Sequence, residues 1–344
     1  HLRVSFTKYM IKNTSLHFLK PKKQILKTSN LKIKKDDIII KVESCGMCGT
    51  DLKIFLNGSK RVKKNRIMGH EISGKIVKVP KNEKYFKKNS NIVLGADIED
   101  HTKEDFALGH EVDGGFQKFL AIKSNILKKF PHFFTKKKIN YDQAAMTEPL
   151  ACCINGIEKI DLKPEGTVVI FGAGTIGQLI SKLCLLNKSK KVFLIDKSEN
   201  RLKKIIKNKK LIKVNYKNIN KILNQKVKEN INYTFVACSS LKAQIDAVKL
   251  APKNSSINFF AGLPKKKGKD PQIAISTNKI HYKELKIVGS HGSKMRHVIK
   301  AAKLIINKKI NLNNMISHKF NLKNASLAFS KLKVGKGLKI IIKP

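Results

Sequence analysis

Two cysteines, Cys45 and Cys48, lie three residues apart in the stretch CGMCGTD. Cysteines at this spacing can form a redox dithiol or half of a structural zinc site, or only one of them can take part in chemistry. The surrounding chain lacks the βαβ pattern that accompanies a thioredoxin-like dithiol. The redox interpretation is therefore disfavoured, and the choice between the others depends on which further ligands the chain offers.

Three more candidate ligands stand in short motifs: His70 and Glu71 in MGHEISG, and Glu148 in TEPLACC. A thiolate, an imidazole and a carboxylate together can hold Zn²⁺ while leaving a fourth position open, as catalytic zinc sites do. Each residue alone has an ordinary explanation, such as a buried thiol, an interior histidine or an acidic residue at a helix start. Their joint presence favours a metal site.

A second motif, GAGTIG at residues 172–177, fits the pattern G-x-G-x-x-G. The apolar run VVIF precedes it and a helical pattern follows, which is the context of a dinucleotide-binding turn. Gly172 permits the tight turn, Gly174 lets the backbone approach a pyrophosphate, and Gly177 allows close packing of helix on strand. The N–H groups of the helix start would bind the phosphates.

Asp196 ends the apolar run VFLID, 19 residues after Gly177. A carboxylate at this place accepts hydrogen bonds from the ribose hydroxyls and repels a 2′-phosphate, so NAD is favoured over NADP. The nearby Lys197 and Arg201 weaken that preference.

The elements that must position these residues change in character along the chain. Residues 32–123 contain short β-rich runs, with a short helix predicted at Gly49–Phe55 directly after the cysteines. Strand and helix patterns alternate from about residue 165 to 290, which predicts a doubly wound parallel sheet. After Gly292 come one helical pattern, HVIKAAKLIINK, and a final strand, GLKIIIKP. The tail is therefore expected to return to the first domain.

Composition limits the function classes. The 344 residues are 41% hydrophobic, enough for two globular domains. The net charge is +48, but only five of the 72 basic residues are Arg, and the Lys are spread through every segment, so no specific nucleic-acid partner is expected. No apolar run approaches the roughly 20 residues of a membrane span, no signal peptide is evident, and the six cysteines show no disulfide spacing. We expect a soluble cytoplasmic protein.

The motifs CGMCGTD, GHE, EPLACCING, GAGTIG and IHYKEL occur in this order along nearly the whole chain. Together they resemble the zinc-dependent medium-chain dehydrogenase/reductase family, and within it most closely the sorbitol and other polyol dehydrogenases. The resemblance implies a GroES-like β-barrel catalytic domain at residues 1–151, an inserted Rossmann NAD-binding domain at 152–290, and a segment at 291–344 that returns to the catalytic domain. It also implies a homodimer or homotetramer.

The resemblance implies a role for each candidate ligand. Cys48 would be the zinc ligand and Cys45 a structural neighbour. His70 would be the second ligand and Glu148 the third, with Glu71 as an alternative carboxylate.

Further residues match family positions around the reaction. Asp51 would orient a ligand histidine, Thr50 would pass the substrate's proton outward, and Lys53 stands where the family often has a histidine in that relay. The expected cofactor contacts are Gly172, Gly174, Ile176, Gly177, Asp196 and Arg201.

The activity implied is oxidation of a secondary alcohol (a polyol, sugar alcohol or cyclitol) to a ketone, with hydride transfer to NAD and one catalytic zinc. A zinc-free reductase of the same family and a threonine-dehydrogenase-like enzyme are the alternatives. The region near residues 95–115 lacks the family's four closely spaced cysteines, so no structural zinc is expected. His101 and His110 in this region are expected to be solvated loop residues.

Overall fold

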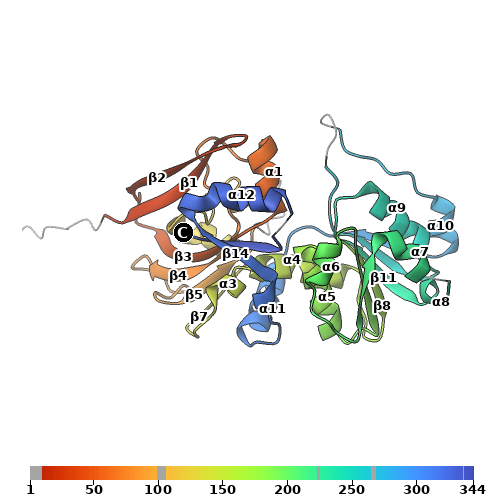
Figure 1. The fold of residues 1–344 in the computed structure, drawn as a ribbon. Helices are drawn as coiled ribbons and strands as arrows, with labels where there is room; N and C mark the ends of the chain where they lie inside the picture. The colour runs from red at the N-terminus through yellow and green to blue at the C-terminus, as the bar shows by residue number, and fades with distance from the viewer. Residues whose placement is uncertain (1–9, 99–105, 223–224, 265–268, 336) are drawn as a thin grey trace, which may run out of the picture. The chain divides into compact units, whose positions relative to one another are not determined.

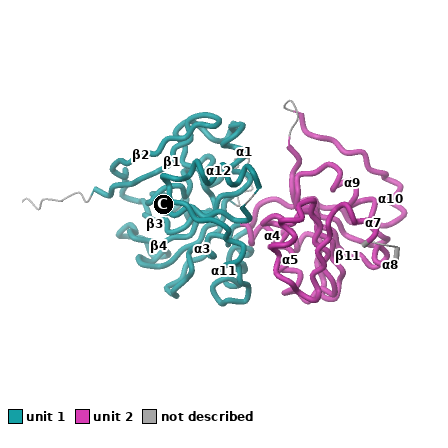
Figure 2. The backbone as a smooth tube through the Cα atoms, in the orientation of Figure 1, with its two compact units in different colours: residues 1–148, 294–344 teal, residues 149–293 magenta. Residues whose placement is uncertain are grey.

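The computed structural model describes residues 10–98, 106–222, 225–264, 269–335 and 337–344 (Figure 1). The chain forms two compact units (Figure 2). Unit 1 combines His1–Glu148 with Lys294–Pro344, and unit 2 is the continuous stretch Pro149–Ser293. The predicted borders were 151 and 290. Unit 2 is therefore an insertion in the chain of unit 1.

Unit 1 is built on a seven-stranded sheet in the order β14-β15-β3-β4-β5-β7, with β6 also paired to β3. Its strands are β3 (Asp37–Met47), β4 (Glu71–Lys78), β5 (Asn91–Leu94), β6 (Phe119–Lys123), β7 (His132–Thr135), β14 (Ile316–Asn321) and β15 (Lys339–Lys343). The strands β1 (Lys12–Lys20) and β2 (Lys23–Asn30) form a separate antiparallel pair. The C-terminal strand β15 thus lies beside the strand that carries the cysteine motif.

The apolar side chains of these strands explain the core of unit 1. Ile38, Ile40 and Val42 of β3 pack with Ile340 and Ile342 of β15 in one buried cluster. The β-branched side chains favour strands, and their burial stabilises the pairing of segments that are distant in the sequence. The helices of unit 1 are α1 (Gly49–Asn57), α2 (Ser124–Lys129), α3 (Tyr141–Ala144), α11 (Met295–Ile306) and α12 (Ala325–Lys333), with single 3₁₀ turns at Asn313–Met315 and Leu322–Asn324.

Unit 2 contains a six-stranded parallel sheet in the order β10-β9-β8-β11-β12-β13. This order, with the first strand in the middle, is that of a doubly wound nucleotide-binding domain and confirms the predicted fold. The strands are β8 (Thr167–Phe171), β9 (Lys191–Asp196), β10 (Leu211–Asn215), β11 (Ile231–Val236), β12 (Ser256–Phe259) and β13 (Lys286–Gly289).

The helices of unit 2 follow its strands along the chain. They are α5 (Thr175–Leu186), α6 (Glu199–Lys203), α7 (Ile219–Ile222), α8 (Gln225–Lys228), α9 (Leu241–Leu250) and α10 (Thr277–Tyr282), with a 3₁₀ turn at Tyr216–Asn218. Helix α4 (Thr147–Lys159) begins in the last residues of unit 1 and continues into the chain of unit 2. None of the helices in the described ranges combines the length and the apolar character that crossing a bilayer demands.

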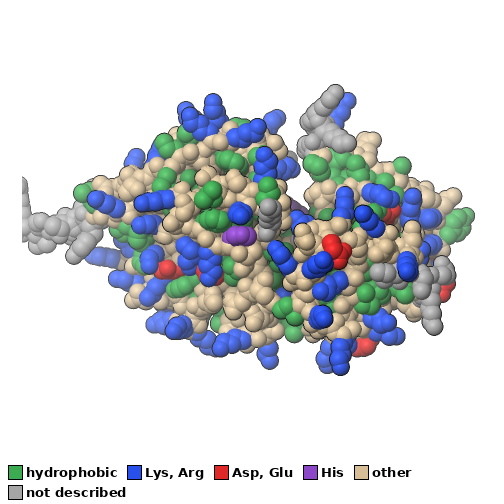
Figure 3. All heavy atoms as spheres, viewed as in Figure 1, with side chains coloured by type: hydrophobic (Ala, Val, Ile, Leu, Met, Phe, Trp, Pro, Cys, Tyr) green, Lys and Arg blue, Asp and Glu red, His purple; other side chains and the backbone are tan. Residues whose placement is uncertain are grey.

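Basic side chains are scattered over the face of the molecule drawn in Figure 3. These lysine and arginine side chains lie on both units, and few acidic side chains lie among them. This distribution matches the spread of Lys along the sequence.

Candidate metal centre and nucleotide loop

Cys48 lies directly before α1 and caps that helix. Its backbone is extended, with φ −126° and ψ 179°, and its Sγ accepts a hydrogen bond from the backbone N–H of Thr50 at 3.3 Å. In return, Asp51 Oδ2 accepts a hydrogen bond from the Cys48 backbone N–H at 2.9 Å. The sequence G-T-D directly after the cysteine therefore builds a reciprocal cap. The partial positive charge of the helix start also favours a thiolate at Cys48.

His70 brings its imidazole to this thiol. Its Nε2 lies 3.3 Å from Cys48 Sγ, and its Nδ1 lies 3.7 Å from Asp51 Oδ1. Burial alone would lower the pKa of His70, but the nearby Cys48, Asp51 and Glu148 raise it well above its usual value. Burial raises the pKa of the Cys48 thiol, and His70 offsets part of that rise. One carboxylate, Asp51, thus both caps the helix and faces the histidine ring.

Glu71, the first residue of β4, points into a buried position beside these two residues. Both its carboxylate oxygens accept hydrogen bonds from Lys339 Nζ, at 2.7 and 2.6 Å. Gly46 stands opposite Glu71 in the paired strand β3. A Cβ at Gly46 would lie 1.8 Å from Glu71 Oε2, so the first glycine of the cysteine motif leaves the room that this carboxylate needs.

The donor atoms fit a zinc ion. One ligand atom each from Cys48, His70 and Glu71 lie within 4.8 Å of one another. Zinc–sulfur and zinc–nitrogen bonds at a tetrahedral angle place the two ligand atoms about 3.5 Å apart, and the observed Sγ–Nε2 separation is 3.3 Å. Glu148 is buried and acts electrostatically on His70. It does not belong to the tight group found among the described residues, so its ligand role and that of Glu71 stay predictions.

The glycine motif of unit 2 forms the turn between β8 and α5. Gly172 has φ +101°, and a Cβ at Gly177 would lie 1.7 Å from the Gly172 carbonyl oxygen. A Cβ at Gly174 would meet no atom within 4 Å, so the space in front of this residue is open. Gly174 precedes α5 without any side-chain cap on the helix N–H groups. The three glycines therefore have the three distinct environments that the motif predicts.

Asp196 ends β9 beside this turn. Its Oδ2 accepts a hydrogen bond from the Ala173 backbone N–H at 2.8 Å, and its Oδ1 accepts one from Ser198 N–H at 2.8 Å. Arg201 Nη1 lies 3.7 Å from the same carboxylate. The backbone carbonyl of Ile176 faces Cys153 Sγ at 3.9 Å. Asp196 thus stabilises the glycine turn through a hydrogen bond. Its predicted binding of the ribose hydroxyls stays a prediction.

Comparison with known proteins agrees with this architecture. The alcohol dehydrogenase GroES-like domain matches residues 34–132. The sorbitol dehydrogenase of Halalkalibacterium halodurans is 24% identical over 90% of this chain and 92% of its own length. The D-arabinitol dehydrogenase 1 of Uromyces fabae is 26% identical over 96% of this chain and 97% of its own length. The chain is therefore similar, over most of its length, to alcohol and polyol dehydrogenases of the medium-chain dehydrogenase/reductase family. This agrees with the predicted resemblance to that family.

Solved structures share the fold of this chain. The 2R,3R-butanediol dehydrogenase of Bacillus subtilis has a TM-score of 0.85 and 19% identity, over 96% of this chain and 99% of that one. The galactitol-1-phosphate dehydrogenase of Escherichia coli has a TM-score of 0.82 and 19% identity, over 96% and 100%. The predicted combination of a GroES-like and a Rossmann fold is therefore confirmed.

The two cysteines of the CGMCGTD motif have different environments. Cys45 is fully buried in β3, and a Cβ at Gly69 or at Gly115 would lie 2.8 Å from its Sγ. Burial raises the pKa of the Cys45 thiol well above its usual value. Cys48 is only partly buried and faces His70. The geometry therefore supports Cys48, rather than Cys45, as the ligand.

The residues predicted to carry the proton lie on the first turns of α1. Thr50 and Lys53 are both exposed. They are three positions apart on a helix, so their side chains lie on one face. Asp51, between them in sequence, is buried against His70 instead.

His110 departs from its expected place. It was predicted to be a solvated loop residue, but its ring packs edge to face against His70, with 5.9 Å between the ring centroids. The prediction was wrong because residues 107–109 are buried, and the turn that follows them places the His110 ring against His70. No local pattern in the sequence reveals this contact, since it depends on two segments 40 residues apart. His101, the other histidine of that region, lies outside the described residues.

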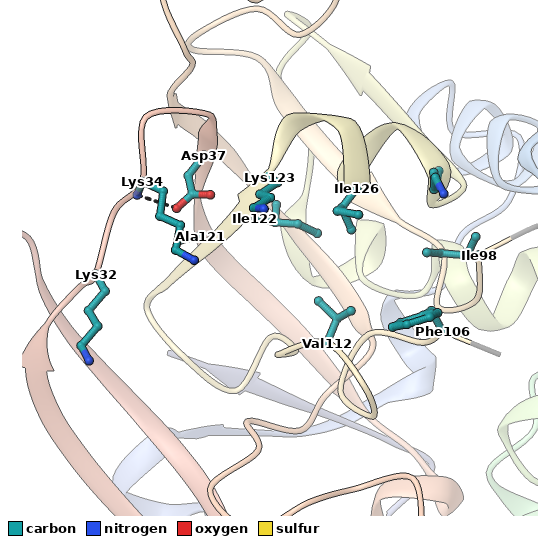
Figure 4. A pocket seen from close by; sticks show the side chains of 11 residues that line it. Lys32, Lys34, Asp37, Ile98, Phe106, Val112, Ala121, Ile122, Lys123 and Ile126 are labelled. Carbon is teal, nitrogen blue, oxygen red and sulfur yellow. Dashed lines mark hydrogen bonds between the residues drawn. The ribbon is translucent and has the colours of Figure 1, made fainter. Parts of the chain in front are cut away.

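A cavity of about 570 Å³ lies on another side of the same segment (Figure 4). Phe106, Val112 and Ile126 point into it, and none of the predicted site residues lines it. The segment from Phe106 to Val112 thus has two sides. Phe106 and Val112 face this cavity, while His110 packs against His70 of the candidate metal centre.

Proposed function

We propose that this protein oxidises a secondary alcohol of the polyol class to a ketone and transfers a hydride to NAD. The observation that carries the proposal is the buried group of Cys48, His70 and Glu71 in unit 1. The glycine turn of unit 2 favours a dinucleotide as the cofactor. The relatives named for sorbitol and arabinitol favour a polyol as the substrate.

Zinc would be held by Cys48, His70 and one carboxylate, Glu71 or Glu148. When bound, zinc supplies a Lewis acid that lowers the pKa of an alcohol hydroxyl. The chain's own residues prepare this site. The helix cap fixes the Cys48 thiol, Asp51 orients His70, and Lys339 holds the Glu71 carboxylate in place.

The proton released by the alcohol needs a route to solvent. Thr50 stands two residues after Cys48, and its backbone N–H already bonds the thiol. Its hydroxyl can accept and donate a proton at the same time. Lys53 lies one turn further along the exposed face of α1. We assign the proton transfer to Thr50, with the relay continuing to solvent through Lys53 or water.

The dinucleotide would bind at the turn formed by residues 172–177. Gly174 leaves open space for the pyrophosphate, and it directly precedes the N-terminus of α5, where a helix favours an anion. The carboxylate of Asp196 favours NAD because it repels a 2′-phosphate. A related dehydrogenase of Sinorhizobium meliloti is described as bound to NADP. Fluorescence titration with NADH and NADPH tests the choice, and we expect NADH to bind more tightly.

The test of the metal site compares the two cysteines of one motif. Zinc per chain is measured in protein purified without added metal, for the wild type, Cys48→Ala and Cys45→Ala. We expect about one zinc in the wild type, its loss in Cys48→Ala and its retention in Cys45→Ala. NAD-dependent oxidation of polyols should follow the zinc content. A wild type without zinc that still catalyses hydride transfer would instead establish a zinc-free reductase.

A further inference from the structure

The two ring nitrogens of His110 are buried without a polar partner among the described residues. Neither of its two ring nitrogens is accessible to solvent, and neither has a hydrogen-bond partner among the described residues. A neutral imidazole carries one donor and one acceptor, and leaving such a group unpaired inside a protein costs about 1–3 kcal/mol. Buried polar groups of this kind normally have a partner, so this one requires an explanation.

The backbone around His110 is tightly fixed. Gly109 has φ +75°, and a Cβ on it would lie 2.9 Å from the backbone nitrogen of Gly69, the residue before His70. The Gly109 N–H donates to the Val112 carbonyl at 2.8 Å, and the His110 N–H donates to the Ala107 carbonyl at 3.2 Å. Gly109 therefore packs closely against the backbone of Gly69, and this contact fixes the position of His110 beside His70.

An ion pair between Arg61 and Glu111 also fixes the turn that carries His110. Arg61 donates to both carboxylate oxygens of Glu111, at 2.6 and 3.0 Å. Glu111 also accepts a hydrogen bond from the Ala107 N–H at 3.0 Å. A bidentate pair of this kind fixes geometry as well as adding energy. The position of the His110 ring is thus built into the turn rather than left to an open loop.

The neighbours of His110 indicate where a hydrogen-bond partner for its ring could bind. Its ring lies edge to face against His70, at a centroid distance of 5.9 Å, beside the candidate metal centre. His110 does not belong to the tight group of donor atoms formed by Cys48, His70 and Glu71. It is therefore placed next to that group rather than within it. A small polar group of a bound ligand can pair with it there.

We propose that His110 hydrogen-bonds a second hydroxyl of the substrate, on the carbon next to the one that is oxidised. This inference rests on the proposed function, because it assumes that the reacting hydroxyl lies at Cys48 and His70. Hydroxyls on neighbouring carbons lie about one hydrogen-bond length apart, so the second hydroxyl comes within reach of the ring beside His70. A hydroxyl can satisfy the imidazole as donor or as acceptor. The substrate class is then a vicinal diol or polyol, and a mono-alcohol leaves His110 unpaired.

The first test compares 2,3-butanediol with 2-butanol, which lacks the second hydroxyl. We expect His110→Phe to lower kcat/KM for the diol about tenfold more than for the mono-alcohol, mainly through KM. His110→Gln keeps a donor and an acceptor and should recover part of the loss. Zinc per chain and NADH affinity should stay at wild-type values in both variants.

The inference is overturned if His110→Phe changes both alcohols by the same factor, or if its effect is explained by loss of zinc. A wild type that oxidises neither alcohol defeats the proposed function instead. The two failures are therefore distinguishable.

A second readout does not depend on turnover. The ring signals of His110 are assigned by NMR from their absence in His110→Gln and followed in the zinc-loaded wild type. We expect 2,3-butanediol to shift them and 2-butanol at the same concentration to leave them in place. Equal responses to the two alcohols, or none to the diol, would overturn the inference.

Discussion

The ammonium group of Lys339 lies 2.6 and 2.7 Å from the two carboxylate oxygens of Glu71, and both side chains are at most 2% exposed. Burial alone would lower the pKa of Lys339, but Glu71 and the nearby Cys48 raise it, so the lysine is charged at neutral pH. A buried pair of this kind is costly to break from one side, because the partner is left as an uncompensated charge.

Replacing Lys339 by Met should therefore destabilise unit 1 by about 3–5 kcal/mol. Urea unfolding followed by circular dichroism measures this loss. Lys323→Met, at an exposed position, controls for the removal of one positive charge and should change stability by less than about 0.5 kcal/mol. The double variant Lys339→Met with Glu71→Gln should regain part of the loss. A double variant as unstable as the single one would show that the pair's charges are not the cause.

The two glycines of the cysteine motif should respond differently to alanine. A methyl group at Gly46 would overlap the Glu71 carboxylate, so Gly46→Ala should cost about 2–3 kcal/mol. A methyl group at Gly49 meets no atom within 4 Å, and alanine favours the helix that begins there. Gly49→Ala should therefore match or slightly exceed wild-type stability in thermal unfolding. Equal losses in both variants would contradict the role assigned to Gly46.

The glycine turn of unit 2 offers a second matched pair. In Gly174→Ala the added methyl group enters open space, so the fold should persist while the Kd for NADH rises at least tenfold. In Gly177→Ala the methyl group would collide with the Gly172 carbonyl oxygen, and the protein should lose about 2–3 kcal/mol of stability. Fluorescence titration and thermal unfolding separate the two effects. Unchanged NADH binding in Gly174→Ala would show that the dinucleotide does not bind at this turn.

The carboxylate of Asp142 should make the free energy of unfolding depend on pH. Burial alone would raise its pKa, but hydrogen bonds from Lys319, Lys343 and Ser44 lower it to about 2. Because the pKa in the unfolded chain is about 4, the ionised form stabilises the fold fully above pH 4, and this contribution is lost as the pH falls toward 2. Asp142→Asn should thus cost about 2 kcal/mol at pH 6 and progressively less below pH 4.

Urea unfolding at pH 6, 4 and 3 measures this change. Asp161→Asn removes a carboxylate whose pair with Lys163 is exposed, and it should show little dependence on pH. A loss in Asp142→Asn that stayed constant down to pH 3 would exclude the ionised carboxylate as its source.

Most of the elements that were predicted correctly came from local patterns in the sequence. The short helix after the cysteines, the glycine turn before α5 and the final strand β15 were all found, because capping residues, glycines and apolar runs act over a few residues. The pairing of Glu71 with Lys339 was missed, since it joins residues 268 positions apart and the chain contains lysine in every segment. His110 was misplaced for the same reason, because its burial comes from contacts with Gly69 and His70.

The insertion of unit 2 has a consequence for the order of events on the ribosome. Unit 2 is one continuous stretch and can fold while the rest of the chain is being made. The cysteine motif emerges early, yet its neighbouring strand β15 and its buried lysine come only from the last residues. At about 5–20 residues per second, the nearly 200 residues after Glu148 take on the order of 10–40 s to synthesise. During that time Cys48 and His70 lack β15 and Lys339, so the candidate metal centre can be completed only after unit 2 has been synthesised.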